Sequence, residues 1–254
     1  MFYQDSDFLN SFINLIRECN KIILDIYNTD FDVVNKDDNS PLTLADQKSN
    51  EHICKFLSSF TNSIIISEEN KNDSYKNRKN AEWCWLVDPI DGTKEFVKRN
   101  GQFTVNIGLC RFGIPVFGIV SIPVSGEIYY GIEGIGSFKM EGDVKTKLHI
   151  YEKNLKSKHL KIVASSSHMN EETTKYIDNF VEPEIVNVGS SIKLLYIAEG
   201  KADVYPRIAP TSEWDTCAAH AVVKYAGGKV LQFGTENEVQ YNKDNLLNPY
   251  FVVY

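Results

Sequence analysis

The chain has 254 residues, of which 43% are hydrophobic, and carries a formal net charge of −7. This length permits one large domain or two packed halves around a substantial core. An acidic surface repels the phosphate backbone of DNA and RNA, so we expect no nucleic-acid polymer as a partner. An acidic protein that handles a phosphorylated substrate must neutralise it locally, with a metal ion or a few placed Lys and Arg side chains.

The cysteines and the N-terminus bear on the compartment. The five cysteines are scattered and form no C-x-x-C pair, which predicts neither a zinc site nor a disulfide framework. No apolar run is long enough to cross a bilayer, and Asp5 and Asp7 stand where a signal peptide carries basic residues. We therefore expect a cytoplasmic protein, either free or peripheral on the inner face of the cell membrane.

The first part of the chain alternates helical and extended patterns. Apolar residues at helical spacing from Phe8 to Ile26 predict an amphipathic helix, and a polar, turn-like segment covers residues 30–40. A second helix is predicted from about Thr43 to Phe60. The β-branched segment Ser63–Ser67 predicts a short strand that ends at two glutamates, and the charged, Asn-rich residues 71–80 predict a mobile surface loop.

Strands dominate from Trp83 onward, until Gly134-x-Gly136 interrupts the pattern, and the rest of the chain mixes both element types. The alternation predicts an α/β protein that forms a single domain of two packed halves, about 1–145 and 146–254, with a boundary near 140–155. Strands are predicted near 83–88, 103–110, 115–122, 127–132, 161–165, 185–188, 203–206 and 251–254, and helices near 94–99, 170–180, 190–199 and 215–226.

The most informative segment joins the strand at 83–88 to the short helix after it. The apolar run Trp83–Val87 ends in Asp88-Pro89-Ile90-Asp91-Gly92-Thr93. Such a turn gathers carboxylates and free backbone N–H groups at one point, which suits a divalent cation that holds a phosphate. An isolated turn of this kind is explained equally well by Asp91 as a helix cap.

Three further acidic positions stand at the ends of predicted elements. Asp46 lies near the start of the second helix, Glu68 and Glu69 end a buried strand, and Asp215 lies in the first turn of the helix at 215–226, where the helix dipole favours its charge. Open α/β architectures place ligands at such ends. Taken alone, Asp46 and Asp215 are explained better as helix caps or exposed residues.

Oxygen ligands without His or Cys favour Mg²⁺, Mn²⁺ or Ca²⁺ over zinc or copper. Several carboxylates around one point cannot all ionise without a cation, because like charges repel strongly at short range. Two Mg²⁺ ions about 4 Å apart would neutralise the acids and clamp a phosphate.

These acidic motifs occur in an order that resembles the lithium-sensitive inositol monophosphatase superfamily. More narrowly, the chain is similar to the family of CysQ-type 3'(2'),5'-bisphosphate nucleotidases, and the resemblance runs from about residue 36 to the C-terminus. The segments that carry it are Asp38–Thr43, Glu68-Glu69, Asp88–Phe96, Lys98–Ile107, Gly189–Lys193, Ala198–Gly200, Tyr205–Arg207, Trp214-Asp215 and Leu247–Pro249.

The resemblance implies a layered α/β/α/β/α sandwich of the inositol monophosphatase and fructose-1,6-bisphosphatase type, two or three bound Mg²⁺ ions, and inhibition by Li⁺. It also implies which residues act. The implied metal ligands are Glu68, Asp88, the carbonyl of Ile90, Asp91 and Asp215; the implied catalytic residues are Asp46 and Thr93; the implied substrate contacts are Glu68, Gly92, Thr93, His168, Ser190, Lys193, Arg207 and Asp215.

The activity implied by the resemblance is Mg²⁺-dependent hydrolysis of adenosine 3',5'-bisphosphate to AMP and phosphate, in which Thr93 positions a water and Asp46 accepts its proton through the Thr93 hydroxyl. Lys193 and Arg207 would hold the phosphate that is not cut. The family often has Ser-Arg-Ser-His where this chain has Ser165-Ser166-Ser167-His168, so phosphate affinity or substrate preference is expected to differ.

Two alternatives remain at this point. One is an inositol or sugar monophosphatase with the same metals, and the other is a non-catalytic nucleotide-binding or regulatory protein on the same scaffold. Without the resemblance, Lys193 is explained as a solvated lysine, Arg207 as a surface charge and His168 as a capping residue. We expect a monomer or a homodimer.

Overall fold

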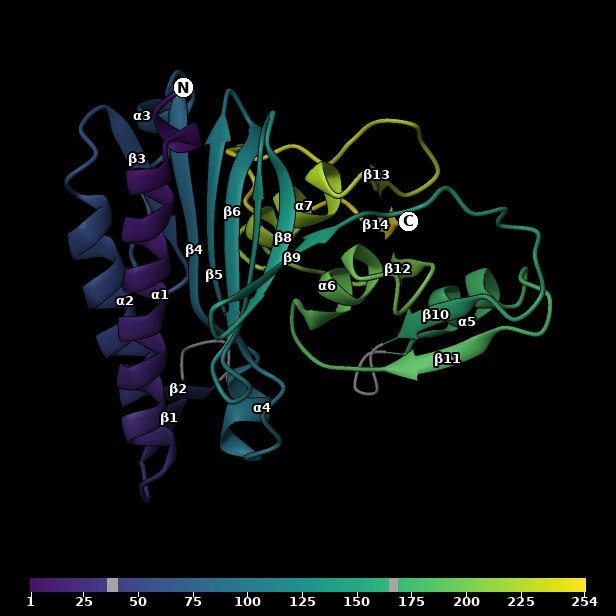
Figure 1. The fold of residues 1–254 in the computed structure, drawn as a ribbon, viewed down its shortest axis with the longest axis horizontal. Coiled ribbons are helices and arrows are strands. Elements are labelled where there is room, and N and C mark those ends of the chain that lie inside the picture. Colours follow the sequence, from purple (N-terminus) through teal and green to yellow (C-terminus); the bar gives the residue numbers. More distant parts are fainter. Residues whose placement is uncertain (36–40, 165–168) are drawn as a thin grey trace.

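The computed structural model describes residues 1–35, 41–164 and 169–254 of the chain (Figure 1). The helices are η1 (Phe2–Gln4), α1 (Ser6–Tyr27), α2 (Leu44–Leu57), α3 (Tyr75–Arg78), α4 (Thr93–Val97), α5 (Glu171–Ile177), α6 (Ile192–Ala198) and α7 (Cys217–Tyr225). The strands are β1 (Val33–Asn35), β2 (Pro41–Thr43), β3 (Ser63–Ser67), β4 (Trp83–Asp91), β5 (Thr104–Arg111), β6 (Ile114–Ile122), β7 (Glu127–Ile132), β8 (Gly136–Glu141), β9 (Val144–Leu148), β10 (Lys161–Ala164), β11 (Glu184–Asn187), β12 (Tyr205–Arg207), β13 (Val230–Gln232) and β14 (Phe251–Val253).

A seven-stranded sheet organises the first part of the chain, in the order β3-β4-β5-β6-β7-β8-β9. Strands β3 and β4 are parallel, and each later neighbour is antiparallel to the one before it. Three smaller sheets complete the described residues: β1-β2, β10-β11 and β12-β14-β13. Because β3 and β4 run in the same direction, their carboxyl ends meet at one edge of the large sheet.

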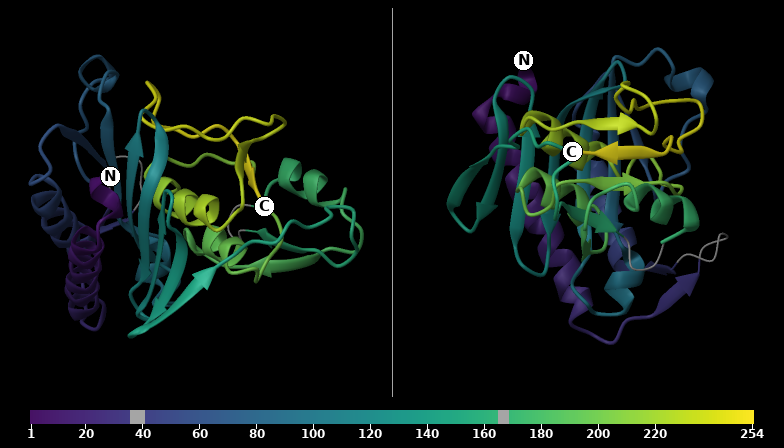
Figure 2. Two further views of the ribbon diagram at one scale, coloured as in Figure 1. Left: turned by 45° about the horizontal axis from the view of Figure 1, so that its top comes forward. Right: turned by 90° about the vertical axis from the view of Figure 1, so that its right-hand side faces the viewer.

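The elements stack in layers, which confirms the predicted α/β sandwich. Helices α1 and α2 cover one face of the large sheet, and α6 and α7 lie on the other (Figure 1). The smaller sheets formed by β10–β14 lie beyond α6 and α7, on the side away from α1, as Figure 2 shows from two further directions. Helix α5 contacts β12 in this outer part.

Aromatic side chains hold α1 and α2 against the large sheet. Phe12 of α1 is fully buried between Trp85 of β4 and Phe117 of β6, with ring centroids 5.2 and 5.0 Å apart. The predicted amphipathic helix is therefore confirmed. Trp85 is 0% exposed, and Trp83 packs at the edge of the same core.

The opposite face is built from small residues. Gly108, Gly118 and Gly131 are paired across β5, β6 and β7. A Cβ atom on Gly118 would lie 2.1 Å from the carbonyl oxygen of Ala218, and one on Gly131 would lie 2.4 Å from that of Ala221. The glycine row therefore lets the backbone of α7 lie directly on the sheet, which fixes the helix and the turn before it.

Several expectations about elements need correction. Strands β8 and β9 continue the sheet past Gly134, which was expected to break the pattern, and β1, β2 and β13 were not predicted. The segment expected to be a mobile surface loop contains α3, and Arg78 there is only 2% exposed because it bonds to Asn242 Oδ1 and the Asp244 carbonyl. Long-range contacts of this kind leave no local trace in the sequence.

None of the helices within residues 1–35, 41–164 and 169–254 combines the length and the apolar character needed to span a bilayer. The division into two halves near 140–155 stays a prediction, since α7 comes from the second half and packs on the sheet of the first.

Candidate active site

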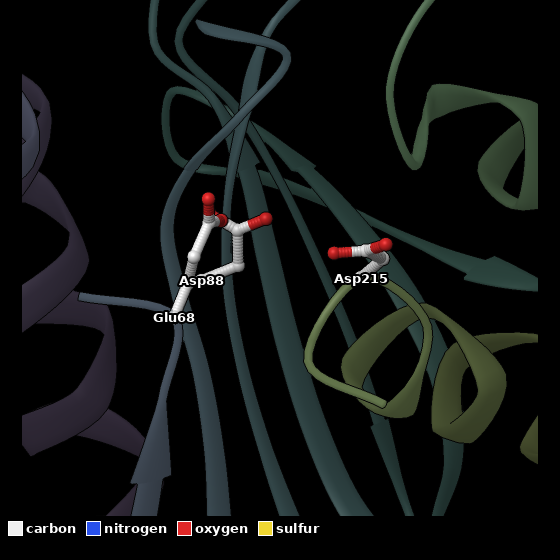
Figure 3. A group of neighbouring side chains, drawn as sticks. All are labelled: Glu68, Asp88 and Asp215. Carbon is white, nitrogen blue, oxygen red and sulfur yellow. The ribbon is translucent and has the colours of Figure 1, made fainter. Parts of the chain in front are cut away.

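Three carboxylates converge where β3, β4 and the segment before α7 meet. Glu68 directly follows β3, and its backbone N–H donates to the carbonyl of Val87, next to Asp88 in β4. Asp215 reaches them from across the sheet edge (Figure 3). Each residue offers an oxygen, and these oxygens lie within 4.8 Å of one another. Asp215 lies in a turn two residues before α7 rather than in the predicted first turn of a helix, and its Oδ2 accepts the Ser212 N–H at 2.8 Å.

Burial and mutual repulsion make this cluster unfavourable as bare anions. Burial, with the charges of Glu68 and Asp91, holds the pKa of Asp88 well above its usual range. Burial and the charge of Asp91 raise the pKa of Asp215 to about 8. A donor set made only of carboxylate oxygens, held close in a buried site, fits a hard divalent cation.

Asp91 is brought to the same place by an irregularity in β4. Asp88 is paired with Asn106 of β5 and Asp91 with Thr104, so three steps along β4 match two along β5. In a regular strand, residues three apart point to opposite faces, and a bulge of this kind removes that alternation. Asp91 therefore approaches Asp88 closely enough for its charge to raise the Asp88 pKa.

Asp46 and Thr93 form a second contact between distant segments. The fully buried Asp46 accepts the Thr43 N–H and hydroxyl on Oδ2, at 2.8 and 2.6 Å. The Thr93 hydroxyl lies 3.3 Å from Asp46 Oδ1 and 3.2 Å from the carbonyl of Ile90, and both can accept its proton. Asp46 is therefore part of a helix cap and also reaches the turn that carries the other acids.

Gly92 allows the turn between Asp91 and Thr93. Its φ is +95°, in the region that favours glycine, and a Cβ atom there would lie 3.2 Å from the carbonyl oxygen of Gln102. The position directly precedes α4, where Thr93 and the residues after it begin the helix.

Two cations lie beside the acidic cluster. Lys193 of α6 is 7% exposed, with its Nζ 5.9 Å from the ring centroid of Tyr205. Burial and the neighbouring Arg207 lower the pKa of Lys193 to about 8, although the charges of Asp91 and Asp215 oppose this. Neither cation forms an ion pair with any residue in the described ranges, and the buried Arg207 Nε has no hydrogen-bond partner among them. Arg207 is held by its Nη2, which donates to the Pro210 carbonyl at 2.8 Å.

The structure thus brings together most of the predicted site residues. Ser190 joins them because its hydroxyl donates to Asp91 Oδ2 at 2.6 Å. His168 lies outside the described residues, as do Ser165–Ser167 and Asp38–Ser40. Sequence reasoning did not assign a role to Thr104, Asn106 or Ser191, which bond around Ser190 and Asp91. For Thr104 and Asn106, the feature of the sequence that could have indicated a role is that two polar residues stand at alternate positions in the otherwise apolar β5.

The sequence profile of the Inositol monophosphatase family matches residues 4–250. The chain belongs to the inositol monophosphatase family. Among curated members, the 3'(2'),5'-bisphosphate nucleotidases CysQ of Salmonella typhimurium and Escherichia coli K12 are each 36% identical over 247 residues, covering 96% of this chain and 98% of theirs. The crystal structure of CysQ from Bacteroides thetaiotaomicron, a bacterial family member, aligns with a TM-score of 0.84 and 41% identity, covering 95% of this chain and 94% of that one.

Proposed function

We propose that this family member is a metal-dependent phosphomonoesterase that hydrolyses adenosine 3',5'-bisphosphate to AMP and phosphate. One observation carries the proposal: a buried carboxylate cluster suited to a cation lies beside two cations, Lys193 and Arg207, that have no acidic partner among the described residues. A divalent cation at the cluster would neutralise the acids and hold one phosphate of the substrate, and a second phosphate would neutralise Lys193 and Arg207. The names of the CysQ relatives support the choice of substrate.

In this proposal the metal is Mg²⁺, with two or three ions held by Glu68, Asp88, Asp91, Asp215 and the Ile90 carbonyl. Mg²⁺, when bound, would neutralise the acids and the scissile phosphate and make a nearby water easier to deprotonate. The Gly92 and Thr93 N–H groups are assigned to the scissile phosphate. Glu68 and Asp215 are assigned to substrate contact as well as to the metal.

Asp46 and Thr93 are assigned the proton transfer. Since two hydrogen bonds occupy Asp46 Oδ2, the proton-accepting atom is Oδ1, which faces the Thr93 hydroxyl. The water proton passes to Thr93 Oγ1 as the Thr93 proton passes to Asp46 Oδ1. The water oxygen bonds to phosphorus while the bond from phosphorus to the 3'-oxygen breaks, and the departing 3'-oxygen takes up a proton from solvent water.

Asp46→Asn tests this assignment. We expect turnover to fall by about 10²- to 10⁴-fold, the usual contribution of a positioned general base. Mg²⁺ affinity, measured by calorimetry, should change little because Asp46 is not among the assigned ligands. Unchanged turnover would remove Asp46 from the mechanism.

Lys193 and Arg207 are assigned the phosphate that is not cut, with Ser190 and His168 as further nucleotide contacts. At a pKa of about 8, Lys193 is mostly protonated at neutral pH and suited to an anion. Lys193→Met should lower kcat/KM for adenosine 3',5'-bisphosphate by about 10- to 100-fold, as expected for a lost charged hydrogen bond. The variant's kcat/KM for adenosine 3'-monophosphate, which lacks the second phosphate, should fall far less. Lys229→Met, at an exposed lysine, is the matched control.

Phosphate release over a small substrate panel tests the proposal as a whole. Adenosine 3',5'-bisphosphate should be cut fastest, chelation of Mg²⁺ should abolish release, and Li⁺ should inhibit. Faster release from inositol 1-phosphate would favour the monophosphatase alternative. Nucleotide binding without phosphate release in Mg²⁺ would favour the non-catalytic alternative.

Location and assembly belong to the same proposal. We propose that the protein is cytoplasmic, either free or peripheral on the inner face of the cell membrane, and that it is a monomer or a homodimer. Sedimentation equilibrium tests the assembly, and fractionation of cells tests the location.

A further inference from the structure

A chain of hydrogen bonds leads from β5 to the carboxylate of Asp91. Thr104 and Asn106 are both 0% exposed and stand two residues apart, so they share one face of β5. The register pairs them with Asp91 and Asp88 of β4. Polar side chains in the middle of a buried sheet are costly unless their hydrogen bonds are satisfied. Here they are satisfied partly by a bond between the two side chains and partly by a segment from the second half of the protein.

That segment is the pair Ser190 and Ser191, directly before α6. The Ser190 hydroxyl and the Ser191 N–H both donate to Asp91 Oδ2, at 2.6 and 2.5 Å. Ser190 has a φ of +57°, a costly conformation for a residue other than glycine. Two donors on one oxygen fix the orientation of the carboxylate. Within residues 1–35, 41–164 and 169–254, no hydrogen bond goes to Asp91 Oδ1, so this oxygen remains for a cation.

The donor and the acceptor of each hydrogen bond in this series can be assigned by starting from the Asp91 carboxylate. An ionised carboxylate only accepts, so Ser190 must donate to Asp91 and can only accept from Thr104, whose oxygen lies 2.6 Å away. Thr104 in turn accepts from the Asn106 amide at 3.0 Å. Ser191 completes the group, because its hydroxyl donates to Asn106 Oδ1 at 2.8 Å and its oxygen lies 2.8 Å from Thr104 Oγ1. Every donor from Asn106 through Thr104 and Ser190 therefore points toward Asp91, and each bond polarises the next.

We propose that Thr104 and Asn106 are positioning residues that orient Asp91 for divalent-cation binding through the Ser190 hydroxyl. The inference rests on the proposed function, because it takes Asp91 as a ligand. Residues that orient a metal ligand through hydrogen bonds typically change metal affinity by about 10- to 100-fold when they are removed. The same series of hydrogen bonds also links the cation site to the segment that carries Lys193, which lies two residues beyond Ser191.

The test compares Thr104→Val, which removes the hydroxyl but keeps the shape, with Thr104→Ser, which keeps the hydroxyl. The readouts are the Kd for Mg²⁺ by calorimetry on protein without nucleotide, and Tm in EDTA. Thr104→Val should raise the Kd about 10-fold or more, and Thr104→Ser should stay within about threefold of wild type. A Thr104→Val protein that binds Mg²⁺ as tightly as wild type overturns the proposal.

Ser121→Ala separates this role from a general loss of buried hydrogen bonding. Ser121 is also 0% exposed in the same sheet, but its hydroxyl donates to Asn20 of α1 on the opposite face, at 2.7 Å. We expect this variant to lower Tm and leave the Kd for Mg²⁺ unchanged. An equal rise in the Kd for Ser121→Ala and Thr104→Val would mean that the effect is merely structural.

Two further variants complete the test. If Thr104→Val does not fold, Ser190→Ala takes its place, because Ser190 is only half-buried and its hydroxyl is the group that donates to Asp91 at the end of the series. Ser190→Ala should raise the Kd for Mg²⁺ by a similar factor. An unchanged Kd contradicts the proposal. Asp91→Asn keeps the two possible failures apart. If Asp91→Asn loses Mg²⁺ affinity but Thr104→Val does not, the positioning role alone is wrong. If Asp91→Asn binds Mg²⁺ like wild type, the ligand assignment in the proposed function is wrong as well.

Discussion

The two faces of the seven-stranded sheet are built on different principles. Toward α1 and α2, large aromatic side chains such as Phe12, Trp85 and Phe117 fill the interface. Toward α7, glycines bring backbone against backbone, and the polar residues Thr104 and Asn106 replace apolar ones. Of the two helices on the aromatic face, α2 carries Asp46 in its first turn, whereas α1 carries none of the assigned site residues. On the glycine face the position of α7 matters directly, since Asp215 just before it must meet Glu68 and Asp88 within a few ångströms.

The comparison suggests that stability and cation binding can be perturbed separately. Trp85→Ala should give the largest loss of stability, about 3–5 kcal/mol, because it removes a fully buried aromatic side chain. Chemical denaturation measures this loss. The Kd for Mg²⁺ should stay within about twofold of wild type, and a much larger rise would show that the aromatic face also sets the site.

Asp88→Asn should raise stability and lower activity, whereas Trp85→Ala should lower stability and leave Mg²⁺ binding nearly unchanged. Removing one negative charge from a buried acidic cluster relieves repulsion, so Tm in EDTA should rise by a few degrees. Phosphate release should fall by about 10²- to 10³-fold, comparable with the loss of one stabilising group at a transition state. A lower Tm in EDTA, with activity retained, would contradict this account of the cluster.

Gly118→Ala should affect both properties. The added methyl would lie 2.1 Å from the Ala218 carbonyl, so α7 must shift, at a cost of about 1–3 kcal/mol. Since Asp215 lies just before α7, we expect weaker Mg²⁺ binding in calorimetry. Gly126→Ala is the control: its φ of +76° makes a side chain strained, but nothing lies within 4 Å. It should lower stability and leave the Kd unchanged.

The smallest predicted effect is a pH dependence of the free energy of unfolding, which comes from His220 of α7 on the glycine face. Burial lowers the pKa of His220 to about 3, and its Nδ1 lies 2.9 Å from the Tyr241 hydroxyl. In the unfolded chain the pKa is about 6.5, so the unfolded state binds the extra proton first as the pH falls. This contribution to stability is complete above pH 6.5 and decreases toward pH 3, by about 1 kcal/mol between pH 7 and 5.5. Denaturation curves of His220→Gln should show a correspondingly weaker decrease, and an identical slope would contradict the assignment.

The residues alone made Glu68, Asp88 and Asp91 visible as candidates, because they stand at or just after the ends of apolar strands, whereas Asp46 and Asp215 were assigned to the site by the family resemblance. The sequence also placed β3, β6 and β7 within a residue of their bounds. It did not predict the irregularity in β4 or the helix start two residues after Asp215, since both depend on pairing with distant segments. The roles of Thr104, Asn106 and Ser191 were missed for the same reason: their partners lie across the sheet or 85 to 87 positions away in the chain.

The most direct test of the central claim is anomalous diffraction from crystals grown with Mn²⁺, which takes the same oxygen ligands as Mg²⁺. We predict a strong anomalous peak within coordination distance of Glu68, Asp88 and Asp215. Crystals that bind Mn²⁺ elsewhere, with no peak between these three carboxylates, would contradict the account.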